Sequence, residues 1–167
     1  MDKNDIQLLI DYNYWANARI LRSAAQVSTE QLRAPFAVSF GSLRGTLVHI
    51  LGTEIVWRMR CHEGYSLPAL PAEQQYPDLA SIQQHWAAEE TIMRAYVASL
   101  NDAVLNGVLK YKTTRGVPSE NVLWQLLAHV VNHGTQFRSE AGVVLTALGH
   151  SPGDIDLIYY LREKAAA

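Results

Sequence analysis

Four long stretches of the chain place apolar residues at every third or fourth position, which is the spacing of one face of an α-helix. This spacing predicts helices over about residues 4–25, 42–61, 78–100 and 118–148. Each stretch has a single apolar stripe, and four such stripes are buried best against one another. The sequence therefore predicts an all-α fold, a four-helix bundle.

Capping residues mark the ends of these helices. Asp2, Asn4 or Asp5 can cap the first, and Ser42 stands at the start of the second. Pro118 and Ser119 are expected to open the fourth helix, and Gly149, directly after Leu148, to end it.

Two shorter elements are predicted outside the bundle. Residues 108–113 are β-prone and precede the turn signal Arg115-Gly116, which indicates a small hairpin in the third connection. Beyond Gly149, Asp154 is expected to cap a short C-terminal helix that runs through Tyr160. Because no internal repeat or linker interrupts the chain, residues 1–167 are expected to form one domain.

Composition narrows the function classes. Apolar residues make up 49% of the 167 residues, which excludes a disordered chain. Fourteen basic against 16 acidic residues leave a net charge of −2, so no electrostatic attraction to nucleic acid or to an anionic membrane is expected. The apolar runs are too short to span a bilayer, and the polar N-terminus does not fit a signal peptide. A cytoplasmic protein is expected, and the single cysteine, Cys61, excludes an internal disulfide.

Several polar residues interrupt the apolar stripes, where burial would cost free energy. His129 and His133 lie four residues apart, so their Cβ atoms are expected about 5–6 Å apart on one helix face. Two imidazoles at this spacing can bind one metal ion, and His49 of the second helix is the natural third ligand. An open site with three histidines suits Zn²⁺ or Ni²⁺ and would activate a bound water or thiol.

The same residues also have structural interpretations. The histidines can be core residues satisfied by hydrogen bonds, and Asn13 and Asn17 can be polar core residues that set the register of the helices. Alternatively, the two asparagines support the metal ligands or face the cleft. Glu54 and Glu89 are expected to pair with arginines.

Other catalytic motifs are missing. The sequence contains no H-E-x-x-H, no E-x-x-H and neither glycine-rich nucleotide fingerprint. Residues 149–153 spell G-x-S-x-G, but they follow a predicted helix instead of a strand, so we interpret them as a helix stop and a turn.

Taken together, four segments resemble the DinB/YfiT-like superfamily over nearly the whole chain. They are residues 11–19 (DYNYWANAR), 47–51 (LVHIL) with Glu54 and Trp57, 129–138 (HVVNHGTQFR) and 148–154 (LGHSPGD). The resemblance implies a four-helix bundle, often a homodimer, which holds a divalent ion through three histidines. Some members of this superfamily are thiol-dependent transferases or isomerases.

In this family the metal histidines usually stand at the positions of His49, of His133 and of the residue four positions later. Here that last residue is Phe137, and Arg138-Ser139-Glu140 also departs from the usual Arg-Gly-Gln. Either His129 substitutes from one turn earlier, or the site has two protein ligands and is weak or lost.

Two function hypotheses follow. In the first, His49, His129 and His133 hold zinc or nickel in a hydrolase or thiol-dependent transferase that acts on a small molecule, with a low-molecular-weight thiol as a candidate partner. Asn13 and Asn17 would then face the cleft. In the second, Phe137 marks a degraded metal site, and the bundle binds a small ligand or a protein as a non-catalytic dimer.

Overall fold

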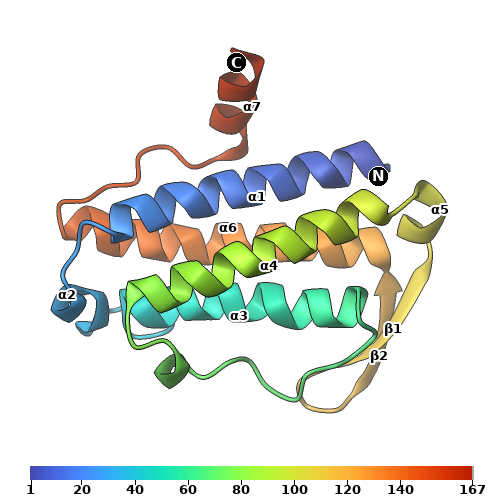
Figure 1. Cartoon of the computed structure of the whole chain (residues 1–167), viewed down its shortest axis with the longest axis horizontal. Coiled ribbons are helices and arrows are strands. Elements are labelled where there is room, and N and C mark those ends of the chain that lie inside the picture. Colours follow the sequence, from blue (N-terminus) through green and yellow to red (C-terminus); the bar gives the residue numbers. More distant parts are fainter. Residues whose placement is uncertain (167) are drawn as a thin grey trace.

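The computed structural model describes residues 1–166 and shows four long helices packed side by side (Figure 1). This arrangement confirms the predicted all-α bundle, and α3 and α6 form its most extensive helix pair. The four helices are α1 (Lys3–Ala24), α3 (Leu43–Cys61), α4 (Leu79–Ser99) and α6 (Leu123–Ala147).

Short elements fill the connections between them. These are α2 (Thr29–Arg33), the 3₁₀-helix η1 (Glu73–Gln75), α5 (Asp102–Leu105), the strands β1 (Val108–Lys112) and β2 (Pro118–Val122), and the last helix α7 (Leu157–Ala165). The strands pair antiparallel, from Val108 opposite Val122 to Lys112 opposite Pro118. The predicted hairpin in the third connection is thus present.

The helix ends follow local chemistry. Asp2 caps α1 by accepting a hydrogen bond from the backbone N–H of Asp5, and the Ser42 hydroxyl accepts one from Gly45 at 2.9 Å. Gly149 adopts a φ of 84° directly after the end of α6. This left-handed conformation lets the N–H of His150 donate to the carbonyl of Leu145 at 2.9 Å, which satisfies a carbonyl at the helix end.

Two predicted boundaries are wrong. The fourth helix begins at Leu123 instead of Pro118, because residues 118–122 pair with the preceding strand and form β2. Gly116, with a φ of 78°, makes the turn that brings the strands together. The last helix is capped by Asp156 instead of Asp154, since the Asp156 carboxylate accepts hydrogen bonds from the two backbone N–H groups at positions 158 and 159.

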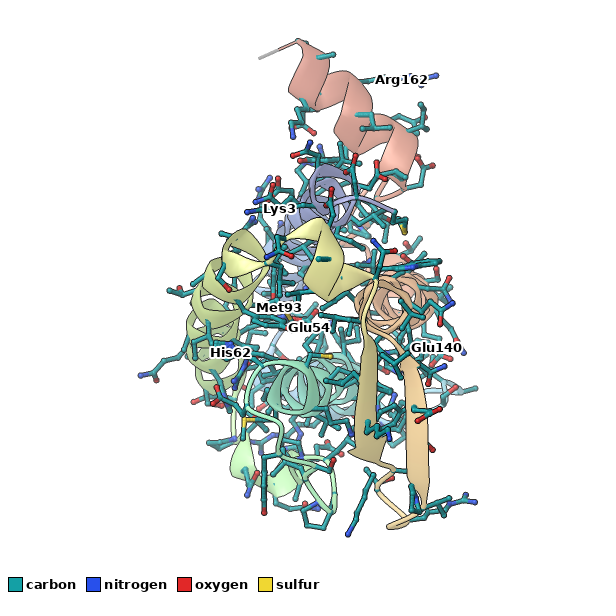
Figure 2. All side chains as sticks on the ribbon, turned by 90° about the vertical axis from the view of Figure 1, so that its right-hand side faces the viewer. Lys3, Glu54, His62, Met93, Glu140 and Arg162 are labelled. Carbon is teal, nitrogen blue, oxygen red and sulfur yellow. The ribbon has the colours of Figure 1, made fainter. Side chains whose placement is uncertain are left out.

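The bundle interior is filled by apolar side chains from all four long helices. Figure 2, a view along the bundle, shows Glu54 and Met93 inside it and Arg162 on the outlying α7. The α7 segment lies outside α1, where the Glu163 carboxylate accepts hydrogen bonds from Trp15 and Arg19, both at 2.9 Å. No helix within residues 1–166 is long and apolar enough to cross a membrane.

Candidate functional site

The candidate site begins with two histidines on facing helices. His49 of α3 and His133 of α6 direct their Nε2 atoms at each other across 3.0 Å, so one ring donates a hydrogen bond and the other accepts it. Thr53, one turn after His49 on α3, places its hydroxyl 3.5 Å from the Nε2 of His133. The close pairing of α3 with α6 therefore brings three polar groups to one point.

Aromatic rings enclose the histidine pair. Phe40 stacks on His49 with ring centroids 3.7 Å apart, and the ring of Phe137 lies 4.5 Å from each imidazole. Burial lowers the pKa of His49 and of His133 to about 4. Both rings are therefore neutral at pH 7, which is the form of imidazole that binds a metal ion.

His129 stands apart from this pair. Its ring centroid lies 5.8 Å from that of His133, and the ring packs edge-to-face with Trp57 with the centroids 5.2 Å apart. Within the described residues 1–166, no group of three or more His, Cys, Asp or Glu side chains is placed to hold one metal ion. The structure thus brings His49 and His133 together, while His129, the predicted third ligand, does not join them.

Each histidine of the pair lines a cavity. One of about 300 Å³ is lined by His129, His133 and residues of the hairpin, and the other, of about 310 Å³, is lined by His49. Leu70, from the connection between α3 and α4, lines both cavities. Each imidazole of the pair therefore borders a cavity large enough for a small molecule.

The two asparagines, for which the sequence left a core role and a place at the cleft open, lie in a buried network away from the histidine pair. Glu54 accepts hydrogen bonds from the side-chain amides of Asn13 and Asn17 and from the indole of Trp86, each at 2.9 Å. Arg138 donates to the amide oxygens of Asn13 and Asn17 at 2.5 and 2.8 Å. The structure thus places both asparagines in the core of the bundle, where every member of this network is almost fully buried.

The expected arginine partners are found for one of the two glutamates. Glu89 forms a buried ion pair with Arg58 at 2.6 Å, as the sequence predicted. Glu54 has no such ion pair among residues 1–166 and is satisfied by neutral donors instead.

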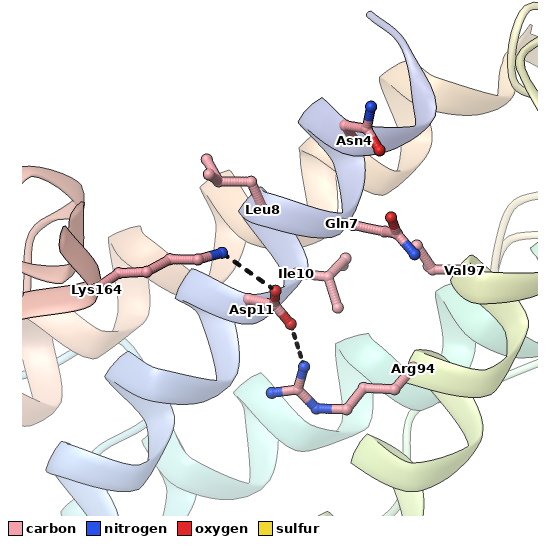
Figure 3. A pocket seen from close by; sticks show the side chains of 8 residues that line it. All are labelled: Asn4, Gln7, Leu8, Ile10, Asp11, Arg94, Val97 and Lys164. Atoms are coloured by element: carbon pink, nitrogen blue, oxygen red, sulfur yellow. Dashed lines mark hydrogen bonds and ion pairs between the residues drawn. The ribbon is translucent and has the colours of Figure 1, made fainter. Parts of the chain in front are cut away.

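A larger cavity of about 520 Å³ lies between α1 and α4, away from the histidines (Figure 3). Asp11 stands between its two cations and contacts both Arg94 and Lys164. Arg94 also pairs with Glu90 at 2.7 Å, so two carboxylates balance the two cations and the cavity presents no unpaired charge to a ligand. We therefore place the candidate site at the histidine pair.

Three residues of the site were not predicted from the sequence. Thr53 could have been found, since it follows His49 by four residues and so shares its helix face. Arg60 lines the cavity beside His133 and falls outside the apolar stripe. Phe40 precedes α3 in an irregular segment, where no periodicity predicts its side-chain direction.

Comparison with known proteins supports the bundle assignment. The model of the DinB family matches residues 1–166 of the chain. The chain is also similar to Protein DinB of Bacillus subtilis (strain 168), with 25% identity over 158 residues, which cover 92% of this chain and 91% of the relative.

Proposed function

From the premise that this chain belongs to the DinB family, we propose that His49 and His133 form the core of a divalent-metal site for a reaction on a small molecule. The observation that carries the proposal is the 3.0 Å separation of their Nε2 atoms, with a cavity beside each ring. The proposed reaction classes are hydrolysis and thiol-dependent group transfer.

The chemistry of the donors supports this site. Two imidazole nitrogens that bind zinc at about 2.0–2.1 Å in a tetrahedral site are roughly 3.3 Å apart. The paired rings would therefore have to separate by only a few tenths of an ångström. We propose His129, one turn before His133 on α6, as the third ligand, which requires its ring to leave Trp57 and turn towards the pair.

The chain's own residues supply the rest of the site. A bound zinc or nickel ion would lower the pKa of a water or thiol and so provide a nucleophile at neutral pH. Trp57, Leu70 and Tyr111 form apolar walls that would hold the substrate and exclude water. The Thr53 hydroxyl is within reach of the histidine pair and can orient a polar group of the substrate.

Metal binding to the untagged protein tests the proposal. Protein treated with EDTA and then titrated with Zn²⁺ or Ni²⁺ in a calorimeter should bind one ion per chain. His49→Ala and His133→Ala should abolish this binding while circular dichroism shows an unchanged helix content. His129→Ala should weaken it, and the exposed His62→Ala serves as the control.

Two results would contradict the metal site. The first is stoichiometric metal retained by both His49→Ala and His133→Ala. The second is a wild-type protein that takes up neither ion at micromolar concentration.

One observation favours a second candidate function. The Phe137 ring fills the space beside both imidazoles, at the position where the family resemblance implies a third histidine. In this alternative the metal site is degraded, and the cavities beside the two histidines bind a small apolar ligand or a partner without catalysis. Binding of small molecules by a protein that takes up no metal would support it.

A further inference from the structure

Arg60 of α3 is a buried cation without a partner. Only 5% of the residue is exposed, yet its side chain forms no hydrogen bond or ion pair with any of residues 1–166. Its Nε atom is buried and unsatisfied. Buried charges are normally paired, because an unpaired one loses its hydration without compensation.

The guanidinium is held by aromatic contacts instead. Its central carbon lies 4.5 Å from the ring centroid of Trp57 and 5.4 Å from that of Tyr111 on β1. These rings cover the faces of the guanidinium and leave its N–H groups as donors that no protein group uses. The side chain is thus fixed in place with its hydrogen-bonding capacity free.

Arg60 lines the same cavity of about 300 Å³ as His133. No aspartate or glutamate lines this cavity, and its other polar groups belong to threonine, histidine, tyrosine and tryptophan side chains. Val56 and Leu70 add apolar surface beside the two aromatic rings. The cavity therefore combines one permanent positive charge with hydrogen-bond donors and apolar walls.

We propose that Arg60 anchors the carboxylate of a small, partly apolar carboxylic acid in this cavity, beside the histidine pair. A guanidinium binds a carboxylate through two parallel N–H···O bonds, and one cation matches a monoanion better than a phosphate dianion. The volume lies at the lower end of the range for ligand pockets, which fits a compact molecule. That this molecule is the substrate rests on the proposed function above.

Benzoate and its neutral analogue benzamide test this anchor. In protein freed of metal by EDTA, tryptophan fluorescence and calorimetry should show benzoate bound at least about tenfold more tightly than benzamide, since charge-assisted hydrogen bonds are the strong ones. Arg60→Gln should remove this preference, and Arg60→Lys should retain part of it. Arg115→Gln, which removes an exposed charge from the hairpin turn, should leave it unchanged.

The stability of the variants provides a second measurement. If Arg60 serves to bind a ligand, its buried and unpaired charge destabilises the protein when no ligand is bound. Arg60→Gln removes this charge and should therefore melt at the same or a higher temperature than the wild type. Benzoate should raise the melting temperature of the wild type and not that of Arg60→Gln. A large loss of stability in Arg60→Gln would instead assign the residue a purely structural role between Trp57 and Tyr111.

Other results would overturn the inference. These are equal binding of benzoate and benzamide by the wild type, an unchanged preference in Arg60→Gln, or inorganic phosphate bound more tightly than benzoate. Because the titrations use metal-free protein, they are independent of the metal site. Selective benzoate binding without any metal uptake would support the role of Arg60 and contradict the proposed metal site. Metal uptake without selective benzoate binding would support the metal site and contradict the role of Arg60.

Discussion

His49 and His133 are 84 positions apart in the sequence, yet their Nε2 atoms are within hydrogen-bond distance at 3.0 Å. Only the pairing of α3 with α6 brings them together, so the site is a product of helix packing. The ring of Phe137 lies 4.5 Å from each imidazole, so the surroundings of the pair are set by this aromatic side chain as well as by the two helices.

Replacing Phe137 by histidine should add a further metal ligand beside the histidine pair. The Phe137 ring lies 4.5 Å from each imidazole, so a histidine on the same helix position can reach an ion bound between them. We expect zinc affinity to rise by roughly tenfold or more in Phe137→His. Calorimetric titration of both proteins measures this directly. An unchanged affinity would mean that position 137 does not face the ion.

Gly134 of α6 should not tolerate a side chain. A Cβ atom there would lie 2.6 Å from Arg138 and 2.7 Å from Asn13, and both of these groups are fixed in the buried network. We expect Gly134→Ala to lower the free energy of unfolding by about 1–3 kcal/mol, despite the better helix propensity of alanine. Chemical denaturation measures the change.

Gly142 of the same helix provides the matched control. A Cβ atom there meets Pro152 at 3.7 Å, an ordinary contact. Gly142→Ala should therefore be neutral or stabilising by up to about 1 kcal/mol. Equal losses in both variants would show that space at position 134 is not the cause.

The buried ion pair of Arg58 and Glu89 should be sensitive to the loss of one partner. Arg58→Met leaves the carboxylate of Glu89, whose side chain is 2% exposed, without its cation. We expect a loss of about 3–5 kcal/mol in the free energy of unfolding. The double variant Arg58→Met/Glu89→Leu should recover most of it, because two apolar side chains then replace both charges.

The exposed pair of Lys110 and Glu120 on the hairpin serves as the comparison. Lys110→Ala should leave the unfolding curve unchanged, since such surface pairs are screened by water and salt. A double variant as unstable as Arg58→Met would indicate a packing defect instead of an unpaired charge.

Cys61 should be unreactive in the folded protein. Burial raises the pKa of its thiol to about 12, so almost no thiolate forms at pH 8. A thiol reagent such as DTNB should modify the chain only after denaturation, and then at one group per chain. Rapid modification of the folded protein at pH 8 would contradict the buried position.

The raised pKa of Cys61 also makes the stability of the folded protein depend on pH. The thiol of the unfolded chain ionises near its ordinary pKa of about 8.5, whereas the folded one stays protonated up to about 12. The unfolded state is therefore favoured increasingly as the pH rises through this range. Cys61→Ala should lose less stability than the wild type between pH 8 and pH 11.

The fold could be predicted where local signals act alone. Ser42 and Gly149 mark helix ends through their own backbone and side-chain chemistry, and the structure confirms both. Pro118 was predicted to start a helix, but proline is equally suited to an edge strand, and its pairing with Lys112 decides for the strand.

The site was only partly visible in the sequence. Helical spacing correctly places His133 near the face that meets α3, but it cannot show that the His129 ring contacts Trp57 instead of the pair. The partners of Asn13 were also beyond reach, since Glu54 and Arg138 come from other helices. Contacts across the bundle depend on how far each helix is rotated about its axis and shifted along it. The spacing of apolar residues determines neither of these.

The network around Glu54 has a consequence for how the protein unfolds. Its five side chains come from all four long helices, with Asn13 and Asn17 on α1, Glu54 on α3, Trp86 on α4 and Arg138 on α6. Detaching any one helix leaves buried donors or acceptors in the other three without partners. A three-helix intermediate is thereby penalised, so the bundle is expected to lose its structure in one cooperative step.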